Sequence, residues 1–370
     1  EGLHTIATYC VKDCDLPLQM LWKLNILENA NEMAVVCSTK ISDIFTRGQQ
    51  IKAYNLICRF SLKRGYVVNY VEIPKPDTYV GATVLEPIPG YHEKPIATLD
   101  FASLYPSIIR AHNLCYSTLI MNRRYLPERS DYAEIEAGGK PHVFVHESKR
   151  AGILPEILTE LLNARKLAKK AMKAAKDPFT KSIQNGRQLA LKIACNSVYG
   201  FTGVQKGFLP CWPIAASTTT IGRGMIDDSK RISEKTYPGA AQCIYGDTDS
   251  VMIKFNDLPS TMDGMKQCFQ RGVELGDVLT DFFAEQTNTK GIIIMEMEKA
   301  CWPFLNWPEK KRYISRYFEH PDGKPKIDAK GVQLVRRDGT PIGKKLYKQC
   351  VDCIIPLEGA MKTRAQIAKE

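Results

Sequence analysis

Three aspartates stand beside short apolar runs, where carboxylates can be held close together. Asp100 ends the run Pro95–Leu99, and Asp247 and Asp249 interrupt the alternating apolar residues between Cys243 and Ile253. The first run predicts a buried strand, and the alternation predicts a β-hairpin with both acids in its turn. Carboxylate oxygens are ligands of hard cations such as Mg2+, and two such ions can activate an attacking oxygen and stabilise a leaving one. Aspartate is also common in turns for structural reasons, so the turn alone does not establish catalysis.

Two basic helical segments lie between these acids. Residues 154 to about 176 are rich in Leu, Ala, Lys and Arg, Asp177-Pro178 breaks that helix, and residues 182–199 form a second one. Two helices around a short turn predict an antiparallel hairpin. Residues three or four positions apart share one helix face, and cations and an amide on such strips could bind a triphosphate. The residues on the two strips are Arg165, Lys169, Lys192, Asn196 and Tyr199. An exposed basic face for solubility is the alternative, and it suits Lys170, Lys173 and Lys176 better.

The net charge of +11 over 370 residues is concentrated in two segments. Residues 147–192 hold eleven Lys/Arg against four Asp/Glu, and residues 308–348 hold twelve against five. Such segments favour a polyanionic partner, although solvated helix faces give the same count. Twelve cysteines at irregular spacings without a signal peptide predict reduced intracellular thiols, and the lone pair Cys350 and Cys353 lacks the second half of a zinc site. No apolar run reaches the roughly 18 residues that span a membrane.

Three motifs in a fixed order resemble those of family B DNA polymerases. Residues 100–109, Asp-Phe-Ala-Ser-Leu-Tyr-Pro-Ser-Ile-Ile, resemble the first palm motif, and residues 245–250, Tyr-Gly-Asp-Thr-Asp-Ser, resemble the third. Residues 192–200, Lys-Ile-Ala-Cys-Asn-Ser-Val-Tyr-Gly, resemble the second motif, which lies in the fingers. The similarity covers residues 1 to about 345. It is greatest to the delta-like replicative enzymes of eukaryotes and large DNA viruses.

The resemblance implies a catalytic site with two Mg2+ ions. Asp100 and Asp249 would hold both ions, Asp247 would be a further ligand or near-ligand, and the Phe101 carbonyl would complete one coordination shell. The residues on the two helix strips would bind the β- and γ-phosphates of the nucleotide as the fingers close. Lys192 would also protonate or shield the departing pyrophosphate.

The resemblance also implies a sugar site after the first aspartate. Tyr105 would stack beneath the incoming sugar, where a 2′-hydroxyl would clash, so it would exclude ribonucleotides. Ser103 and Leu104 would lie beside the nucleotide. A packed core tyrosine is compatible with this role, because such a gate must itself be held rigid.

Shorter elements resemble parts of the family that contact DNA. Residues 79–82, Tyr-Val-Gly-Ala, resemble an element that contacts the template, and residues 309–313 resemble the Lys-Lys-x-Tyr element that grips the primer end. The residues carried over are Tyr79, Gly81, Lys310, Lys311, Arg312 and Tyr313. Lys330-Gly331 and Arg336-Arg337-Asp338 follow as at the approach to the thumb. A solvated charge run is the alternative for the basic elements.

Two further pairs of residues leave alternatives open. Tyr9 and Asp13 resemble the third proofreading-exonuclease motif, whose partner motifs would precede residue 1, so this fragment is expected to lack proofreading. A polar start to a turn of helix is the alternative for Asp13. Glu296 and Glu298 alternate onto one face of a predicted strand. They either approach the metals from the side or are ordinary surface residues.

The fold implied is α+β with the right-hand architecture of polymerases. It comprises an antiparallel-sheet palm, an antiparallel two-helix fingers insertion and the start of a helical thumb. The expected order is the C-terminal end of a 3′–5′ exonuclease domain (1–28), a linker and N-terminal palm approach (29–90), the first part of the palm (91–147), the fingers (148–205), the second part of the palm (206–325) and the start of the thumb (326–370).

The expected activity is template-directed addition of deoxynucleotides to a primer 3′-hydroxyl with release of pyrophosphate, in a fragment of a larger replicative polymerase that also proofreads. Primer–template DNA and dNTPs are the expected partners, together with a sliding clamp and accessory subunits bound through regions outside this chain. The expected location is the nucleus or a viral replication compartment, and no membrane partner is expected. Ala102, residues 302–307 and residues 314–316 depart from the cellular delta pattern, which favours a viral or divergent member.

Two other classes are weighed against a DNA polymerase. An inactive structural subunit would have lost some of the acids or phosphate-binding cations, and in this sequence all are present. A reverse transcriptase or RNA polymerase would share two palm acids but would lack the motif at residues 192–200.

Overall fold

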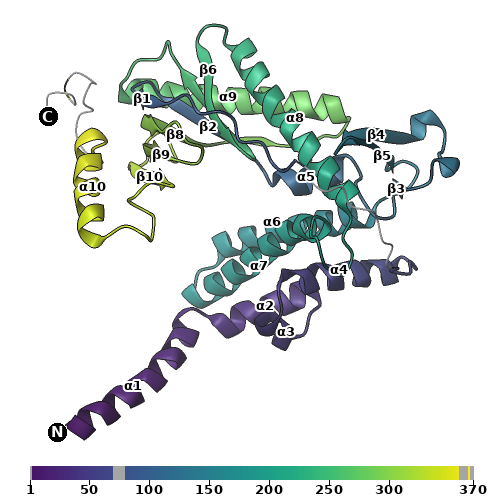
Figure 1. Cartoon of the computed structure of the whole chain (residues 1–370), viewed down its shortest axis with the longest axis horizontal. Coiled ribbons are helices and arrows are strands. Elements are labelled where there is room, and N and C mark those ends of the chain that lie inside the picture. Colours follow the sequence, from purple (N-terminus) through teal and green to yellow (C-terminus); the bar gives the residue numbers. More distant parts are fainter. Residues whose placement is uncertain (1, 70–79, 358–365, 367–370) are drawn as a thin grey trace. The chain divides into compact units, whose positions relative to one another are not determined.

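The computed structural model describes residues 2–69, 80–357 and 366, which form two compact units (Figure 1). One unit comprises residues 1–79 and 112–218, and we call it the helical unit. The other comprises residues 80–111 and 219–370, and we call it the sheet unit. The mixture of helices and antiparallel strands confirms the expected α+β class.

A hairpin of two long helices dominates the helical unit. These helices are α6 (Ile153–Ala174) and α7 (Pro178–Thr202). An apolar stripe that recurs every three or four residues lets α6 bury one side, as its buried residues Leu154, Ile157, Leu158 and Leu161 show. The antiparallel hairpin predicted from the basic segments is therefore present.

The second helix of the hairpin begins four residues earlier than the sequence predicted. Asp177 is its N-cap, and its Oδ1 accepts a hydrogen bond from the backbone N–H of Thr180 at 2.7 Å. Pro178 occupies the first helical position, where a missing N–H costs nothing. Asp177-Pro178 thus starts α7 as well as separating it from α6.

Residues 26–63, most of which lie in the segment 29–90 predicted as a linker and palm approach, are helical for most of their length. The helices that precede the hairpin are α1 (Gly2–Lys23), α2 (Ile26–Cys37), α3 (Ile41–Thr46) and α4 (Gln49–Lys63). Both α2 and α4 pack against α7. Gly186 permits the close approach of α7 to α2, because a side chain there would collide with the amide of Asn29.

A small three-stranded sheet completes the helical unit. Its strands lie in the order β3 (Leu119–Ile120), β5 (Lys140–Val145) and β4 (Tyr132–Ala137), and the short helices η1 (Arg123–Tyr125) and η2 (Arg129–Asp131) separate β3 from β4. Gly138 and Gly139 form the tight turn between β4 and β5 with φ of 61° and 72°, which suits glycine.

The sheet unit is built on a seven-stranded antiparallel sheet. Its strand order is β10 (Lys326–Lys330), β9 (Tyr313–Phe318), β8 (Met295–Asn306), β2 (Ile96–Phe101), β7 (Ser250–Phe255) and β6 (Ala241–Asp247), and β1 (Gly90–His92) also pairs with β8. The hairpin predicted around Asp247 and Asp249 is β6–β7, and the buried strand predicted before Asp100 is β2.

Helix α9 (Met262–Thr287) covers one face of this sheet. Gly272 and Gly276 lie against Met297 and Met295 of β8, and the rings of Phe283 and Phe101 are 5.5 Å apart. Because side chains alternate along β2, Asp100 points away from the face that carries Phe101. The opposite face is therefore the one that displays the acidic side chain.

Three further helices belong wholly or partly to the sheet unit. They are α5 (Leu104–Ala111), α8 (Trp212–Thr236), which belongs to this unit from residue 219 onward, and α10 (Pro341–Ile354). No helix among the described residues is both long and apolar enough to cross a membrane.

Candidate active site

Main-chain pairing at the end of β2 brings two of the predicted acids together. Asp100 lies opposite Ser250 of β7 on one side and Glu296 of β8 on the other. The backbone N–H of Phe101 donates to the carbonyl of Asp249 at 2.8 Å. The register of the sheet thus holds Asp100 and Asp249 at neighbouring strand ends.

The turn between β6 and β7 is held in a strained conformation. Thr248 has a φ of 61°, in the left-handed region that a β-branched residue rarely adopts. Its N–H donates to the carbonyl of Thr83 at 3.0 Å, its hydroxyl donates to Asp247 Oδ1 at 3.0 Å, and the Asp249 N–H donates to the Asp247 carbonyl at 2.7 Å. Strain of this kind persists where surrounding contacts enforce it, and it is common at functional sites.

The carboxylates at the ends of these neighbouring strands repel one another. Burial, followed by the charges of Asp249, Glu298 and Glu296, raises the pKa of Asp100 to about 7, with Lys299 partly opposing the rise. Burial is also the main reason that the pKa of Asp249 is raised. Ionised carboxylates crowded in this way are an arrangement that a bound cation would relieve.

Asp247 differs from the other two acids because a lysine already compensates it. Lys311 Nζ lies 2.6 Å and 2.7 Å from the two carboxylate oxygens. Lys311 has a φ of 65°, and its backbone N–H donates to the Tyr245 hydroxyl at 2.9 Å, which fixes the residue in that conformation. Asp247 is therefore oriented by an ion pair, whereas Asp100 and Asp249 are held by strand geometry.

A groove of about 620 Å³ runs past this turn. Acids of the turn and basic or aromatic residues from the chain after β8 share its walls. The lining includes Asp247, Asp249, Lys311, Tyr313, Lys330 and Gly331. Negative and positive side chains thus stand on the walls of one groove.

A β-bulge in β8 determines which side chains accompany Asp100. Thr98 pairs with Lys299 and Leu99 pairs with Met297, so Glu298 is an extra residue. Since Asp100 pairs with Glu296, the bulge puts both Glu296 and Lys299 on the face of Asp100. Both glutamates influence the pKa of Asp100 electrostatically, but no sequence pattern indicated a lysine beside them.

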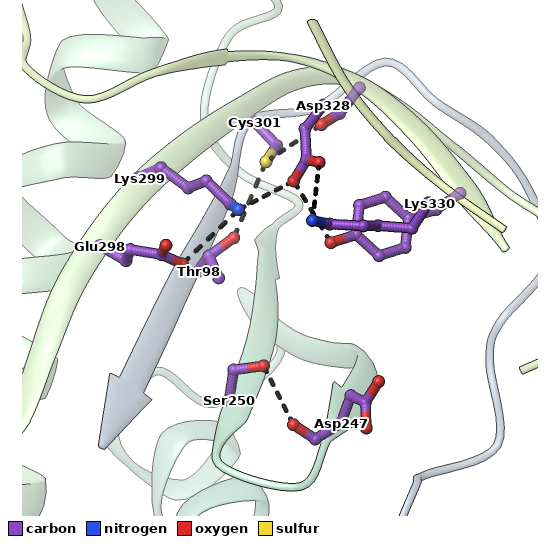
Figure 2. Close-up of polar contacts among 10 residues, drawn as sticks. Thr98, Asp247, Ser250, Glu298, Lys299, Cys301, Asp328 and Lys330 are labelled. Carbon is purple, nitrogen blue, oxygen red and sulfur yellow. Dashed lines mark hydrogen bonds and ion pairs between the residues drawn. The ribbon is translucent and has the colours of Figure 1, made fainter. Parts of the chain in front are cut away.

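Lys299 belongs to a polar network that sequence reasoning missed (Figure 2). Its Nζ lies 2.9 Å from Asp328 Oδ2 and 3.5 Å from Glu298 Oε2. The Tyr313 hydroxyl donates to Asp328 Oδ2 at 3.3 Å, and Lys330 Nζ lies 3.7 Å from Asp328 Oδ1. Burial by itself lowers the pKa of Lys299, but the hydrogen bond to Asp328 and neighbouring negative charges raise it overall.

The first predicted palm motif continues from Asp100 into α5. Ser103 has a φ of 58° at the start of this helix, Leu104 is buried, and Tyr105 is half-buried. A methyl group at Gly222 of α8 would lie 3.5 Å from Tyr105 Cε1, an ordinary van der Waals distance, so α8 passes close to the Tyr105 ring at this glycine.

The predicted triphosphate-binding residues lie on the α6–α7 hairpin of the helical unit. Arg165 and Lys169 are on α6, and Lys192, Asn196 and Tyr199 are on α7. Arg165 Nε is a buried nitrogen without a hydrogen-bond partner among the described residues. Lys192 and Asn196 are exposed, and neither has an ion-pair or hydrogen-bond partner in that part of the chain. The hairpin thus presents polar groups whose bonding capacity is unused.

The residues predicted to contact DNA have acidic or backbone partners. Lys310 Nζ lies 2.6 Å from Glu86 and 2.9 Å from the Val84 carbonyl, and Arg312 lies 3.7 Å from Glu309. Arg223 of α8 donates to the carbonyls of Val80 and Gly81, which holds that short element in place. Tyr79 lies outside the described residues.

Comparisons with known proteins decide the family. A model described as DNA polymerase family B matches residues 39–370. The chain belongs to DNA polymerase family B. It is 43% identical over 363 residues to the DNA polymerase delta catalytic subunit of Drosophila melanogaster, covering 95% of this chain and 32% of that protein.

Other similar proteins are also DNA polymerase delta catalytic subunits. The corresponding subunit of Candida albicans is 42% identical over 96% of this chain and 34% of its own length. That of Bos taurus is 41% identical over 91% of this chain and 30% of its own length. The chain spans about a third of the length of these relatives.

The donor set of this family B chain fits hard cations, although no ready-made cluster is present. Among the described residues, no group of three or more His, Cys, Asp and Glu side chains is arranged to hold a metal ion. Asp100 and Asp249 supply oxygen ligands, and burial, followed by the charges of neighbouring acids, raises the pKa of both carboxyls. The pair therefore fits a hard divalent cation, whereas Asp247 is engaged by Lys311.

Two expectations at the ends of the chain stay predictions. Tyr9 and Asp13 lie one turn apart on α1 with exposed side chains, as their spacing required. Cys350 and Cys353 are exposed free thiols on α10.

Proposed function

We propose that this chain is the catalytic core of a template-directed DNA polymerase that adds deoxynucleotides to a primer 3′-hydroxyl and releases pyrophosphate. The observation that carries the proposal is the pair Asp100 and Asp249, held by main-chain pairing beside a groove that also carries lysines. Membership of family B supports it, because the similar proteins are named as DNA polymerase delta catalytic subunits. In this proposal residues 91–147 and 206–325 form the palm, residues 148–205 with the α6–α7 hairpin form the fingers, and the segment from residue 326 begins the thumb.

Asp100 and Asp249 would hold two Mg2+ ions, with Asp247 and the Phe101 carbonyl as further or near ligands. When bound, these ions would promote ionisation of the attacking hydroxyl and neutralise charge on the triphosphate. Lys311 keeps the Asp247 carboxylate oriented. The strained Thr248 turn keeps the spacing of the two turn acids fixed before substrate arrives.

The helical hairpin would bind the triphosphate of the incoming nucleotide. Arg165, Lys169, Lys192 and Asn196 supply the cations and the amide, and an arriving phosphate would satisfy the buried Nε of Arg165. Lys192 would also protonate or shield the pyrophosphate. Tyr105, backed by Gly222, would exclude the 2′-hydroxyl of ribonucleotides, with Ser103 and Leu104 beside the sugar.

The remaining assignments concern DNA and cellular partners. Gly81, with Tyr79, would contact the template, and Lys310, Lys311, Arg312 and Tyr313 would hold the primer end. We further propose that the full-length protein proofreads, with Tyr9 and Asp13 as part of its exonuclease site. A sliding clamp and accessory subunits would act through other regions, in the nucleus or a viral replication compartment.

Primer extension by the full-length protein tests the proposed activity. Labelled primers annealed to DNA or RNA templates are incubated with dNTPs or rNTPs and Mg2+, and a variant carrying both Asp100→Asn and Asp249→Asn serves as the blank. We expect extension on the DNA template with dNTPs, stoichiometric pyrophosphate, and none of this in the blank. Extension confined to RNA templates or rNTPs would instead indicate a reverse transcriptase or RNA polymerase. Equal activity of the blank would refute the assignment of the acids.

A further inference from the structure

A buried carboxylate joins three strands beside the groove. Asp328 on the edge strand β10 accepts hydrogen bonds from Lys299 of β8 at 2.9 Å and from Tyr313 of β9 at 3.3 Å (Figure 2). The side chains of Asp328 and Lys299 are only 11% and 12% exposed. Lys330, two residues further along β10, approaches the same carboxylate at 3.7 Å with a side chain that is 60% exposed.

This network orients side chains more than it stabilises the fold. Removing two charges from water costs about as much as their mutual attraction returns, and apolar residues of similar size often replace such a pair without loss of stability. Apolar replacements could not orient a hydroxyl group or an ammonium group. The specific effect of Asp328 is therefore on the side chains that it bonds, Tyr313 and Lys330.

Those two side chains belong to the groove that passes the turn acids. Tyr313 and Lys330 line it together with Asp247, Asp249 and Lys311. Tyr313 is 7% exposed, its ring stacks on Phe304 at 5.1 Å, and its hydroxyl is held by Asp328, so the ring has little freedom. Contacts with Asp328 and Phe304 thus restrain the wall of the groove that Tyr313 and Lys330 form.

Lys330 is the most exposed cation of the network. The Lys299 side chain is 12% exposed and lies 2.9 Å from Asp328 and 3.5 Å from Glu298, whereas the Lys330 side chain is 60% exposed and stands 3.7 Å from Asp328. Lys311 on the same groove is paired with Asp247. An anion entering the groove would therefore find Lys330 as the cation best able to accept it, and a phosphodiester of the primer strand has the required charge.

We propose that Lys299 and Asp328 are positioning residues that set Tyr313 and Lys330 to hold the phosphate backbone at the primer end. This inference rests on the proposed polymerase function. It adds two residues that contact neither nucleotide nor metal, and it assigns Lys330 as a direct phosphate contact. The network acts on primer binding, and binding of the dNTP is independent of it.

Charge-changing variants separate positioning from a simple effect of charge. The full-length protein is prepared as Lys299→Met, Asp328→Asn, the double variant and Tyr313→Phe, and binding of a fluorescent recessed primer–template is measured by anisotropy without catalysis. A charge effect alone predicts that Asp328→Asn binds DNA more tightly and Lys299→Met more weakly. Positioning predicts that both, and also the charge-balanced double variant, bind roughly 5- to 10-fold more weakly, and Tyr313→Phe roughly 3-fold.

Kinetics supply a readout that a loss of folding would not reproduce. The KM for primer–template is expected to rise in Asp328→Asn and Tyr313→Phe, while the KM for dNTP at saturating DNA stays near the wild-type value. Thermal melting identifies any variant that fails to fold, and Tyr313→Phe, which removes only a hydroxyl, keeps the test decisive in that case. Equal or tighter DNA binding by Asp328→Asn, or wild-type binding by folded Tyr313→Phe, would overturn the proposal.

A matched control lies at the same strand pair. Glu319→Gln breaks the exposed ion pair between Glu319, the residue that follows β9, and Lys326 of β10, and it should leave DNA binding unchanged. Asp249→Ala distinguishes failure of this inference from failure of the proposed function. If Asp249→Ala abolishes extension while Asp328→Asn binds normally, the positioning role alone is wrong. If Asp249→Ala extends primers normally, the proposed catalytic site is wrong whatever the binding results show.

Discussion

The lysines around the β6–β7 turn and the polar groups that the sequence assigned to triphosphate binding on the hairpin differ in their partners. In the sheet unit, Lys311 is paired with Asp247, Lys310 with Glu86 and Lys299 with Asp328. On the hairpin, Lys192 and Asn196 have no such partner among the described residues, and Arg165 Nε is unsatisfied. Paired groups are fixed in position, whereas unpaired cations gain the full attraction of an arriving anion. Under the proposed function, the paired groups belong to the site of the reaction and the unpaired groups to the binding of the triphosphate.

The largest effect is expected from the two acids of the β6–β7 turn. Asp249→Ala removes a carboxylate that has no ion-pair partner among the described residues, and it should lower incorporation by about 10³-fold or more, because several kcal/mol of charge stabilisation are lost. Asp247→Ala removes a carboxylate already paired with Lys311 and should cost less, about 10- to 100-fold. Single-turnover incorporation at saturating Mg2+ measures both, with primer–template binding as the control. Equal losses would remove the distinction between the paired and unpaired acid.

The unpaired groups of the hairpin should govern nucleotide affinity. Arg165→Ala and Lys192→Ala should each raise the KM for dNTP by about 10- to 100-fold, since a hydrogen bond to a charged group is worth about 1.5–3 kcal/mol. Lys173→Ala on the same helix as Arg165 is the matched control and should have little effect. Steady-state kinetics at saturating primer–template give these values. A comparable rise for Lys173→Ala would indicate general attraction by the basic hairpin.

Substitution of Tyr105 tests whether this side chain of the sheet unit determines the preference for deoxyribose over ribose. Tyr105→Ala removes the ring that packs against α8 at Gly222, and the preference for dNTP over rNTP should fall by about 10-fold. Tyr105→Phe keeps the ring and should retain the preference. The ratio of kcat/KM for dATP and ATP measures it. An unchanged ratio in Tyr105→Ala would exclude the gate.

The smallest expected effect concerns stability and pH. The pKa of Asp100 is raised from an ordinary 3.8 to about 7, so between these values the folded protein keeps a proton that the unfolded chain releases. Folding stability therefore falls as pH rises through this window. Asp100→Asn should raise the free energy of unfolding by about 1–2 kcal/mol at pH 8 in EDTA, with little gain near pH 4. Urea unfolding at both pH values measures the gain, and a gain independent of pH would show that ionisation of Asp100 is not its cause.

The chemistry-bearing elements could be predicted from sequence because their signals are local. The apolar run before Asp100 and the alternation around Asp247 and Asp249 define β2 and the β6–β7 hairpin within a few residues. Composition and spacing likewise revealed the α6–α7 hairpin. The helical start at Asp177-Pro178 was misplaced because the same pair that ends one helix also caps the next.

The grouping of charges on one face of the sheet depends on the fold. Lys299 reaches the face of Asp100 through a bulge in β8, and no feature of the sequence marks the extra residue Glu298. Asp328 meets Lys299 across 29 residues through pairing of β8, β9 and β10, which depends on register. The family, the acids and the elements that carry them can be predicted from the sequence alone, because each of these signals lies within a short run of neighbouring residues. The ion pairs that orient the acids and their groove join strands distant in sequence, so they become visible only in the folded sheet.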